Sequence, residues 1–186
     1  MSENKPQKIS PVSGVKEDFS KYCRDIPDFP KKGIIFKDIT PLLKDSRVFK
    51  QAIDTLAGHF AAQKPDVIIC IDARGFLVGS ALAYRLNCGL VPVRKKGKLP
   101  WQVYSQTYDL EYGQDTLEIH ADAFRAGQRV LIVDDVLATG GTAAAVVSMV
   151  KAMKGEIVGV GFLLELKSLN GRAKLPDMDI YTLMKC

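Results

Sequence analysis

The sequence predicts an α/β fold, in which a Rossmann-like parallel sheet carries flanking helices. Two observations predict it: short, wholly apolar runs are typical of strands buried on both faces, and helical patterns separate these runs along the chain. Strands connected in this way lie parallel, because the crossover through a helix is right-handed. The 186 residues, 47% of them hydrophobic and 25% charged, fit one globular domain with a sizeable core.

The first helix is predicted over residues 46–62, with Ser46 as its N-cap. Large apolar residues recur there at the spacing of one helix face, and they are Phe49, Ile53, Leu56 and Phe60. The pattern indicates an amphipathic helix that packs one side against the sheet.

A strand, a helix and a second strand are predicted next. Val67–Ile71 is a short continuous apolar run, typical of a buried strand. Phe76–Leu86 predicts a helix that stops at Asn87–Gly89. Leu90–Val93 predicts the second strand, and Pro92 indicates a strand end or a sheet edge because it has no amide hydrogen to donate.

Residues 95–115 break the pattern. They carry basic, aromatic and polar side chains without clear periodicity, which predicts an irregular loop. Loops of this length are uncommon in compact domains and often act as lids, so we expect a flap that closes over a site. A merely exposed hairpin is the alternative.

The second half of the chain returns to strands and a helix. Thr116–His120 alternates like a half-buried strand, and Val130–Val133 is a fully apolar run. Ala143–Met153 predicts an apolar helix, and Ile157–Leu164 predicts another buried strand.

Charge and composition exclude several classes of protein. The net charge of +5 comes without a long basic tract, so an anionic small molecule is favoured over nucleic acid as the ligand. No apolar run reaches the roughly 18 residues of a membrane span. Residues 1–16 are expected to form a flexible tail, since they lack the apolar stretch of a secretory signal. Four scattered cysteines without a CxxC pair favour a reducing compartment, and a cytoplasmic location is expected.

The strongest functional motif spans Val130–Thr142, where a predicted strand runs into a predicted helix. Ligands of such sheets bind beyond the carboxyl ends of the strands. Gly140 and Gly141 let successive N–H groups approach a ligand, and the helix N-terminus adds unpaired donors and a positive dipole end. Thr139 and Thr142 add hydroxyl donors. The motif predicts a phosphate site, although it lacks the Lys of the nucleoside-triphosphate loop.

Two adjacent acids, Asp134 and Asp135, follow the strand directly. They would repel a bare phosphate, so we expect them to accept hydrogen bonds from ribose hydroxyls. Contact with Mg²⁺ carried by the ligand is also open. A 5-phosphorylated sugar satisfies both halves of the motif. The structural alternative is an acid pair that only caps a glycine-rich helix start.

Val130–Thr142 resembles the phosphoribosyl diphosphate signature of the type I phosphoribosyltransferases. Further segments resemble the adenine phosphoribosyltransferase branch of that family. They are Asp28–Pro41, Asp72–Phe76, Arg94–Pro100 and Tyr108–Gly113. The match runs in order from about Phe19 to the C-terminus, so the resemblance covers nearly the whole chain.

The resemblance implies an enzyme of purine salvage. In that family, 5-phosphoribosyl 1-diphosphate and adenine give AMP and diphosphate, with Mg²⁺. The resemblance also implies a type I phosphoribosyltransferase fold, as a single domain over 17–186 with a small hood segment at about 25–42 and a flexible flap at about 95–120. Since the family is usually dimeric, a homodimer is expected. Neither nucleic acid nor a membrane is expected as a partner.

Three groups of residues match the substrate contacts of the family. The loop that holds the 5-phosphate matches Ala138, Thr139, Gly140, Gly141 and Thr142. The diphosphate contacts match Asp72, Ala73, Arg74, Lys95 and Lys98. The base contacts match Ile35, Phe36, Lys37 and Val136. In the family, the aromatic ring stacks on the base, the valine position covers the other face, and backbone groups read the adenine edge.

Catalytic roles are expected for Glu111, Arg74, Asp134 and Asp135. Glu111 resembles the family's proposed acid–base residue at the base, and Tyr112 follows it in the flap. Departure of diphosphate leaves positive charge on the ribose and negative charge on the leaving group. Arg74, with the flap lysines, is expected to stabilise the latter. No protein side chain is assigned as a direct metal ligand, and Mg²⁺ is expected to arrive with the substrate.

Two alternatives stay open. A transferase for a 6-oxopurine would share the ribose-phosphate motif, but its base commonly requires a cationic donor, whereas main chain beside Phe36 suits adenine. A non-catalytic regulator that senses 5-phosphoribosyl 1-diphosphate would need an added DNA-binding domain or a basic RNA-binding face. No helix-turn-helix module fits in the short N-terminal tail.

Overall fold

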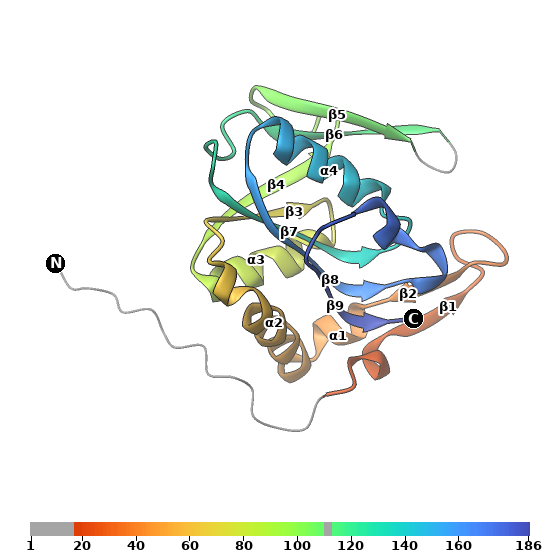
Figure 1. The fold of residues 1–186 in the computed structure, drawn as a ribbon. Coiled ribbons are helices and arrows are strands. Elements are labelled where there is room, and N and C mark those ends of the chain that lie inside the picture. Colours follow the sequence, from red (N-terminus) through yellow and green to blue (C-terminus); the bar gives the residue numbers. More distant parts are fainter. Residues whose placement is uncertain (1–16, 110–112) are drawn as a thin grey trace, which may run out of the picture.

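The computed structural model describes residues 17–109 and 113–186. A seven-stranded sheet lies between helices on its two faces, and a small two-stranded sheet lies beside it (Figure 1). The strand order of the large sheet is β5-β6-β4-β3-β7-β8-β9. Its strands are β3 (Val67–Ile71), β4 (Gly89–Lys95), β5 (Val103–Asp109), β6 (Gln114–His120), β7 (Arg129–Leu137), β8 (Glu156–Glu165) and β9 (Ile180–Lys185). All but β5 and β6 are parallel, so the predicted fold class is confirmed.

The helices cover two hydrophobic cores, one on each face of the sheet. Every residue of β3 is buried, as expected of a central strand covered on both sides. Ile68 joins the core under α2 (Ser46–Phe60) and α3 (Gly75–Leu86), and Ile69 joins the core under α4 (Gly141–Ala152). The shorter helices are α1 (Thr40–Lys44), η1 (Phe19–Tyr22), η2 (Ala61–Gln63), η3 (Lys167–Leu169) and η4 (Gly171–Lys174). Among the described residues, no helix is long and apolar enough to cross a membrane.

The small sheet pairs β1 (Arg24–Pro27) with β2 (Ile35–Asp38) in antiparallel register. Arg24 Nη2 lies 2.6 Å from the Asp38 carboxylate, which ties the two strands together. The same carboxylate accepts a hydrogen bond from the backbone N–H of Thr40, at the start of α1. The small sheet is thereby fixed to the start of α1, whose Leu42 belongs to one of the two cores.

The helix predicted over 46–62 is confirmed as α2, but its predicted cap is wrong by one residue. The N-cap is Asp45, not Ser46. Asp45 Oδ1 accepts hydrogen bonds from the backbone N–H groups of Arg47 and Val48 at 3.1 and 3.0 Å. Asp and Ser both cap helices well, so the helix could begin after Asp45 or after Ser46, and the sequence pattern does not distinguish the two.

The irregular loop predicted over 95–115 is wrong for much of its length, because β5 and β6 pair in antiparallel register along their whole lengths. Tyr104 and Tyr108 alternate along β5 and pack against the core under α4. β6 joins β4 only at Arg94 and Lys95 within the described residues, so Pro92 lies where β4 is unpaired on that side. Pro92 thus lies inside β4 and not at its end, and the edge prediction holds only locally, on the side of β4 that is unpaired at this position.

Candidate active site

The predicted phosphate motif lies at the carboxyl end of β7, in the middle of the sheet (Figure 1). β7 continues through the two acids to Leu137, so only Ala138–Gly140 form the loop, and α4 begins at Gly141. Gly140 has a φ of 78°, a left-handed conformation that glycine adopts without steric cost. The first N–H groups of α4 lack acceptors within the helix, as at any helix N-terminus.

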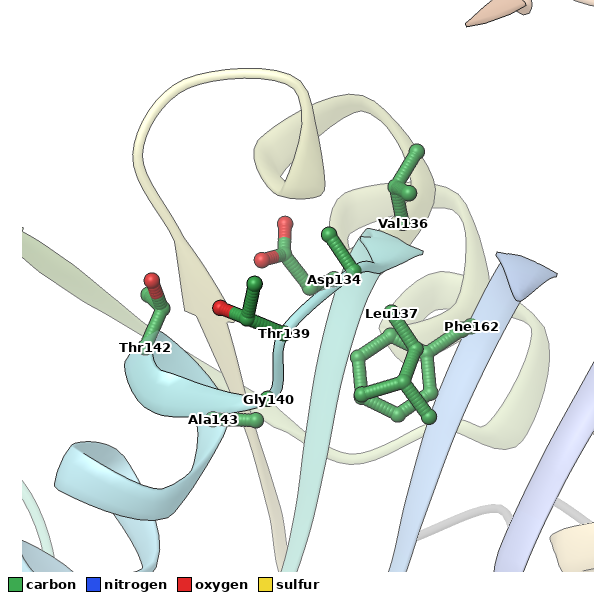
Figure 2. Close-up of a pocket in the computed structure, with 9 residues that line it drawn as sticks. Asp134, Val136, Leu137, Thr139, Gly140, Thr142, Ala143 and Phe162 are labelled. Atoms are coloured by element: carbon green, nitrogen blue, oxygen red, sulfur yellow. The ribbon is translucent and has the colours of Figure 1, made fainter. Parts of the chain in front are cut away.

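A pocket of about 60 Å³ opens on this loop. It is lined by Asp134, Val136, Leu137, Ala138, Thr139, Gly140, Thr142, Ala143 and Phe162. Figure 2 shows the Asp134 carboxylate and the hydroxyls of Thr139 and Thr142 on one side, and the side chains of Leu137 and Phe162 packed together on the other. The polar groups meet at the helix N-terminus, where N–H donors and the helix dipole stabilise a phosphate.

The two acids have different surroundings. Asp134 lines the pocket, and its Oδ1 accepts a hydrogen bond from the backbone N–H of Asp135 at 2.9 Å. Burial, together with the neighbouring charge of Asp135, raises the pKa of Asp134 well above its ordinary value. Asp135 is buried and forms an ion pair with Arg74. Asp134 is therefore the acid at the pocket, whereas Asp135 neutralises a cation of the neighbouring loop.

The second predicted loop, Asp72–Gly75, follows β3 and touches the first. A Cβ atom on Gly75 would lie 2.7 Å from Asp134 Oδ1 and 3.3 Å from its Cα, so a side chain does not fit there. The absence of a side chain at Gly75 thus lets the carboxyl ends of β3 and β7 meet, as the sheet topology predicts.

Ion pairs hold this second loop in place. Arg74 reaches Asp135 of β7, and Asp72 Oδ2 accepts a hydrogen bond from Arg94 Nε of β4 at 3.0 Å. The peptide bond between Asp72 and Ala73 is cis. The loop is thus tied by charge to the strands on both of its sides.

The predicted base-binding segment lies against the same loop. The guanidinium carbon of Arg74 lies 5.2 Å from the centroid of the Phe36 ring, and Phe29 packs edge-on against that ring, also at 5.2 Å. Ile35 is 56% exposed, and the Lys37 amine donates a hydrogen bond to an acid of β1. Phe36 is therefore brought to Arg74, and through Arg74 to Asp135.

Of the predicted diphosphate lysines, Lys95 is the last residue of β4 and Lys98 follows the turn after it. Lys95 Nζ lies 3.1 Å from the Asp115 carboxylate, and Lys98 is exposed. Arg94 Nη1 donates a hydrogen bond to the backbone carbonyl of Lys98 at 3.4 Å, while its Nε bonds to Asp72. Arg94 therefore links the basic turn to the Asp72 loop, a role that the sequence did not indicate.

Two further contacts at the phosphate loop were outside the predicted site. The Tyr108 hydroxyl of β5 lies 3.3 Å from Thr142 Oγ1, and the backbone of Gly171 packs against Gly140. The sequence carries only weak indications of these two contacts. Tyr108 is one of two tyrosines on the same face of β5, and Asn170–Gly171 is a common turn dipeptide. The predicted flap residues Glu111 and Tyr112 lie outside the described residues.

The described part of the chain contains no group of three or more His, Cys, Asp or Glu side chains placed to hold a metal ion. Mg²⁺ usually keeps several waters and binds through one or two carboxylates together with substrate phosphates. The adjacent carboxylates Asp134 and Asp135 fit that partial role beside a phosphate pocket.

Comparison with known proteins agrees with this geometry. Residues 41–186 match the phosphoribosyl transferase domain. The chain is 59% identical to an adenine phosphoribosyltransferase of Trichlorobacter lovleyi over 91% of its own length and 99% of that protein. Among solved structures, it is similar to adenine phosphoribosyltransferase of Thermoanaerobacter pseudethanolicus, with a TM-score of 0.89, 53% identity, and coverage of 92% and 100% of the two chains.

A more distant solved structure is adenine phosphoribosyltransferase of Saccharomyces cerevisiae in complex with adenine and an imino-altritol bisphosphate. It has a TM-score of 0.86 and 39% identity, and the match covers 90% of this chain and 97% of the yeast chain. The domain match and these relatives span nearly the whole described structure. The chain therefore belongs to the adenine phosphoribosyltransferase family, within the phosphoribosyl transferase domain proteins.

Proposed function

We propose that this chain transfers the 5-phosphoribosyl group of 5-phosphoribosyl 1-diphosphate to adenine, forming AMP and diphosphate in purine salvage. The observation that carries the proposal is the pocket at the β7–α4 loop, which combines a helix N-terminus, two hydroxyls and an acid. Relatives with 59% and 53% identity bear the name of this enzyme. The yeast relative was solved with adenine bound, which supports adenine as the base.

The sugar phosphate would bind with its 5-phosphate against residues 138–142. The free N–H groups of the helix start and the hydroxyls of Thr139 and Thr142 would donate hydrogen bonds to it. Asp134 and Asp135 would then accept hydrogen bonds from the ribose hydroxyls. The diphosphate would extend toward the Asp72–Gly75 loop, which lies beside Asp134.

The base would bind against the small sheet. Phe36 would stack on one face of adenine, Val136 would cover the other, and the backbone at Ile35 and Lys37 would read its edge. A backbone carbonyl accepts a hydrogen bond from the amino group of adenine, but it repels the oxygen of a 6-oxopurine. This difference favours adenine over hypoxanthine or guanine.

In the reaction, the bond from C1′ to diphosphate breaks and N9 of adenine bonds to C1′, losing its proton. The ribose carries positive charge as the bond breaks, and the carboxylates beside it would stabilise that charge. Arg74, Lys95 and Lys98 would stabilise the diphosphate. Mg²⁺ bound with the diphosphate would spread the negative charge of the leaving group. Glu111, on the flap, would exchange the proton with the base.

The proposal includes the organisation of the protein. We expect one domain over 17–186, with the hood at 25–42 and the flap at 95–120, in a cytoplasmic homodimer. An exposed stripe on α3 supports the dimer: Leu77 is 52% exposed and Tyr84, two turns later, is 92% exposed. Sedimentation of the full chain tests this point, and the mass of a monomer at micromolar concentration would contradict it.

Turnover assays test the proposed reaction. The chain is incubated with 5-phosphoribosyl 1-diphosphate, Mg²⁺ and, in parallel, adenine, hypoxanthine, guanine, xanthine or orotate. We expect AMP from adenine and no nucleotide from the other bases. A nucleotide formed only from a 6-oxopurine would contradict the base assignment. No product from any base, despite binding of 5-phosphoribosyl 1-diphosphate, would contradict the enzymatic role and favour a sensor.

A further inference from the structure

A turn after β8 packs against the back of the phosphate loop. It consists of η3 and η4, and η4 begins at Gly171. A Cβ atom on Gly171 would lie 2.2 Å from the carbonyl oxygen of Ala138 and 3.0 Å from the backbone nitrogen of Gly140. A Cβ atom on Gly140 would lie 2.3 Å from the carbonyl oxygen of Gly171. The two backbones therefore touch, and neither position has room for a side chain.

This contact fixes the direction of one peptide group in the loop. The Ala138 carbonyl faces the turn. The Ala138–Thr139 peptide is trans, so the Thr139 N–H points the opposite way from that carbonyl. It therefore points away from the turn, as a donor to the pocket requires. A side chain on Gly171 would push the carbonyl aside and rotate this donor with it.

Arg172 fastens the turn to the ends of two strands. Its Nε and Nη2 donate to the two carboxylate oxygens of Glu165 at 2.7 and 2.9 Å, a paired geometry that is among the stronger hydrogen-bonded contacts in proteins. Nη2 also donates to Thr182 Oγ1 at 3.3 Å, and Nη1 donates to the Ile180 carbonyl at 3.2 Å. Glu165 and Thr182 are buried and bond to each other. The turn thus has little freedom to move away from the loop.

We infer that Gly171 and Arg172 are positioning residues for the 5-phosphate site. Arg172 fixes the turn, and Gly171 lets the turn support the Ala138–Gly140 backbone whose N–H groups hold the phosphate. Neither residue touches the substrate. The inference rests on the proposed function, since it concerns the phosphate of a phosphoribosyl substrate.

Three variants of the full chain test it: Gly171→Ala, Arg172→Lys and the control Gly58→Ala. Gly58 lies in α2, where a Cβ atom would meet no atom within 4 Å. Steady-state kinetics give the KM for 5-phosphoribosyl 1-diphosphate, the KM for adenine and kcat. Calorimetric titration with ribose 5-phosphate gives a dissociation constant that requires no turnover.

For Gly171→Ala, we expect the KM for 5-phosphoribosyl 1-diphosphate and the Kd of ribose 5-phosphate to rise about 10- to 100-fold, as for a lost hydrogen bond to a charged group. The KM for adenine should stay within about threefold, because the change leaves the base contacts intact. Arg172→Lys keeps the charge but loses the paired geometry, so the same two constants should rise about three- to tenfold. Gly58→Ala should match the wild type.

If Gly171→Ala binds ribose 5-phosphate as tightly as the wild type, the inference is wrong. If Gly171→Ala is unfolded at the assay temperature, Arg172→Lys serves as the test. A KM for 5-phosphoribosyl 1-diphosphate and a Kd of ribose 5-phosphate equal to those of the wild type would then overturn the inference. A wild-type chain that binds ribose 5-phosphate but makes no AMP would refute the proposed reaction only, and the binding constants of the variants would still decide the inference. No binding of ribose 5-phosphate to the wild type would overturn both.

Discussion

Two neighbouring loops at the carboxyl edge of the sheet are built in opposite ways. The loop between β7 and α4 is held by backbone packing, with two glycines in contact at its back. The loop between β3 and α3 is held by charge, through Arg74 with Asp135 and through Asp72 with Arg94. Each follows a parallel strand and precedes a helix, so the difference lies in the residues and not in the topology.

The difference indicates how the two ends of the substrate would bind. A phosphate that enters the loop before α4 meets donors already in position. In the proposed binding mode, a diphosphate would draw Arg74 from Asp135, and a base stacked on Phe36 would compete with the same guanidinium for the ring. We therefore expect a preorganised phosphate site, whereas binding of the leaving group and of the base would be coupled through Arg74. Four substitutions challenge this comparison, and they are taken from the largest expected effect to the smallest.

Replacing both acids should give the largest loss. In the variant with Asp134→Asn and Asp135→Asn, kcat/KM for AMP formation should fall about 10²- to 10⁴-fold, since two charged hydrogen bonds to the ribose are lost. Circular dichroism should show an intact fold. Ribose 5-phosphate should still bind, although more weakly, through the preformed loop. A fully active double variant would refute the ribose assignment.

Arg74→Lys tests the charge-held loop. Lysine keeps the positive charge but cannot span Asp135 and the Phe36 ring with a planar fork, so kcat/KM should fall about 10- to 100-fold. The Kd of ribose 5-phosphate should change less than the KM for 5-phosphoribosyl 1-diphosphate, because ribose 5-phosphate lacks the diphosphate and is affected by Arg74 only through its pairing with Asp135. Arg47→Lys, at an exposed pair with Glu17, is the matched control. If Arg74→Lys weakened the binding of 5-phosphoribosyl 1-diphosphate and of ribose 5-phosphate equally, the two loops would not hold separate parts of the substrate.

Asp134→Asn alone should make the protein more stable at neutral pH. Burial and the charge of Asp135 raise the pKa of Asp134, so its carboxylate is disfavoured in the folded state. The penalty is absent below about pH 4, where the acid is protonated in both states, and grows as pH rises through the folded pKa. The melting temperature should rise about 2–4 °C at pH 7, the shift produced by about 1 kcal/mol in a chain of this size.

The same measurement at pH 4 should show little gain for Asp134→Asn. Asp135→Asn is the comparison variant, and it should lower the melting temperature at pH 7 because it removes the partner of Arg74. A gain at pH 7 that persists unchanged at pH 4 would contradict the electrostatic origin.

The smallest effect is expected from Asp115→Asn, which releases Lys95 from its exposed ion pair. The KM for 5-phosphoribosyl 1-diphosphate should fall about two- to threefold at low salt, since exposed pairs contribute little and are screened by ions. The difference should vanish at about 0.5 M salt. Glu156→Gln, which removes the exposed pair with Arg129 at the start of β8, is the control. A higher KM for Asp115→Asn would mean that this pair positions Lys95 for binding.

The phosphate loop could be predicted from the sequence because its function is local. A buried strand, two acids, small residues and a helix start follow one another within Val130–Thr142. The support from Gly171 could not be predicted, since it depends on a backbone contact between residues far apart in the chain. The pairing of Arg74 with Asp135 likewise depends on β3 and β7 being neighbours in the sheet, and sequence spacing does not reveal that.

The fold, too, could be predicted where the signal is local in the sequence, and not where it depends on contacts between distant residues. Strands buried on both faces could be predicted because they are continuous apolar runs, as in Val67–Ile71. β5 was missed because Ser105, Gln106 and Thr107 make it polar, and its alternation is carried only by two tyrosines. β9, at the edge of the sheet, was not predicted either, since one of its two buried residues is the polar Thr182 and its apolar residues other than Met184 are only half-buried. The position of β9 in the sheet depends on its parallel pairing with β8, which the sequence does not show.

A crystal structure of the chain with AMP and diphosphate tests the central claim most directly. We expect phosphate oxygens about 2.7–3.2 Å from backbone nitrogens within residues 139–142, and the adenine ring on Phe36. Arg74 should have moved from Asp135 to the diphosphate, while the backbone of 138–142 should be unchanged. A phosphate bound elsewhere, or an adenine ring that does not touch Phe36, would contradict the account.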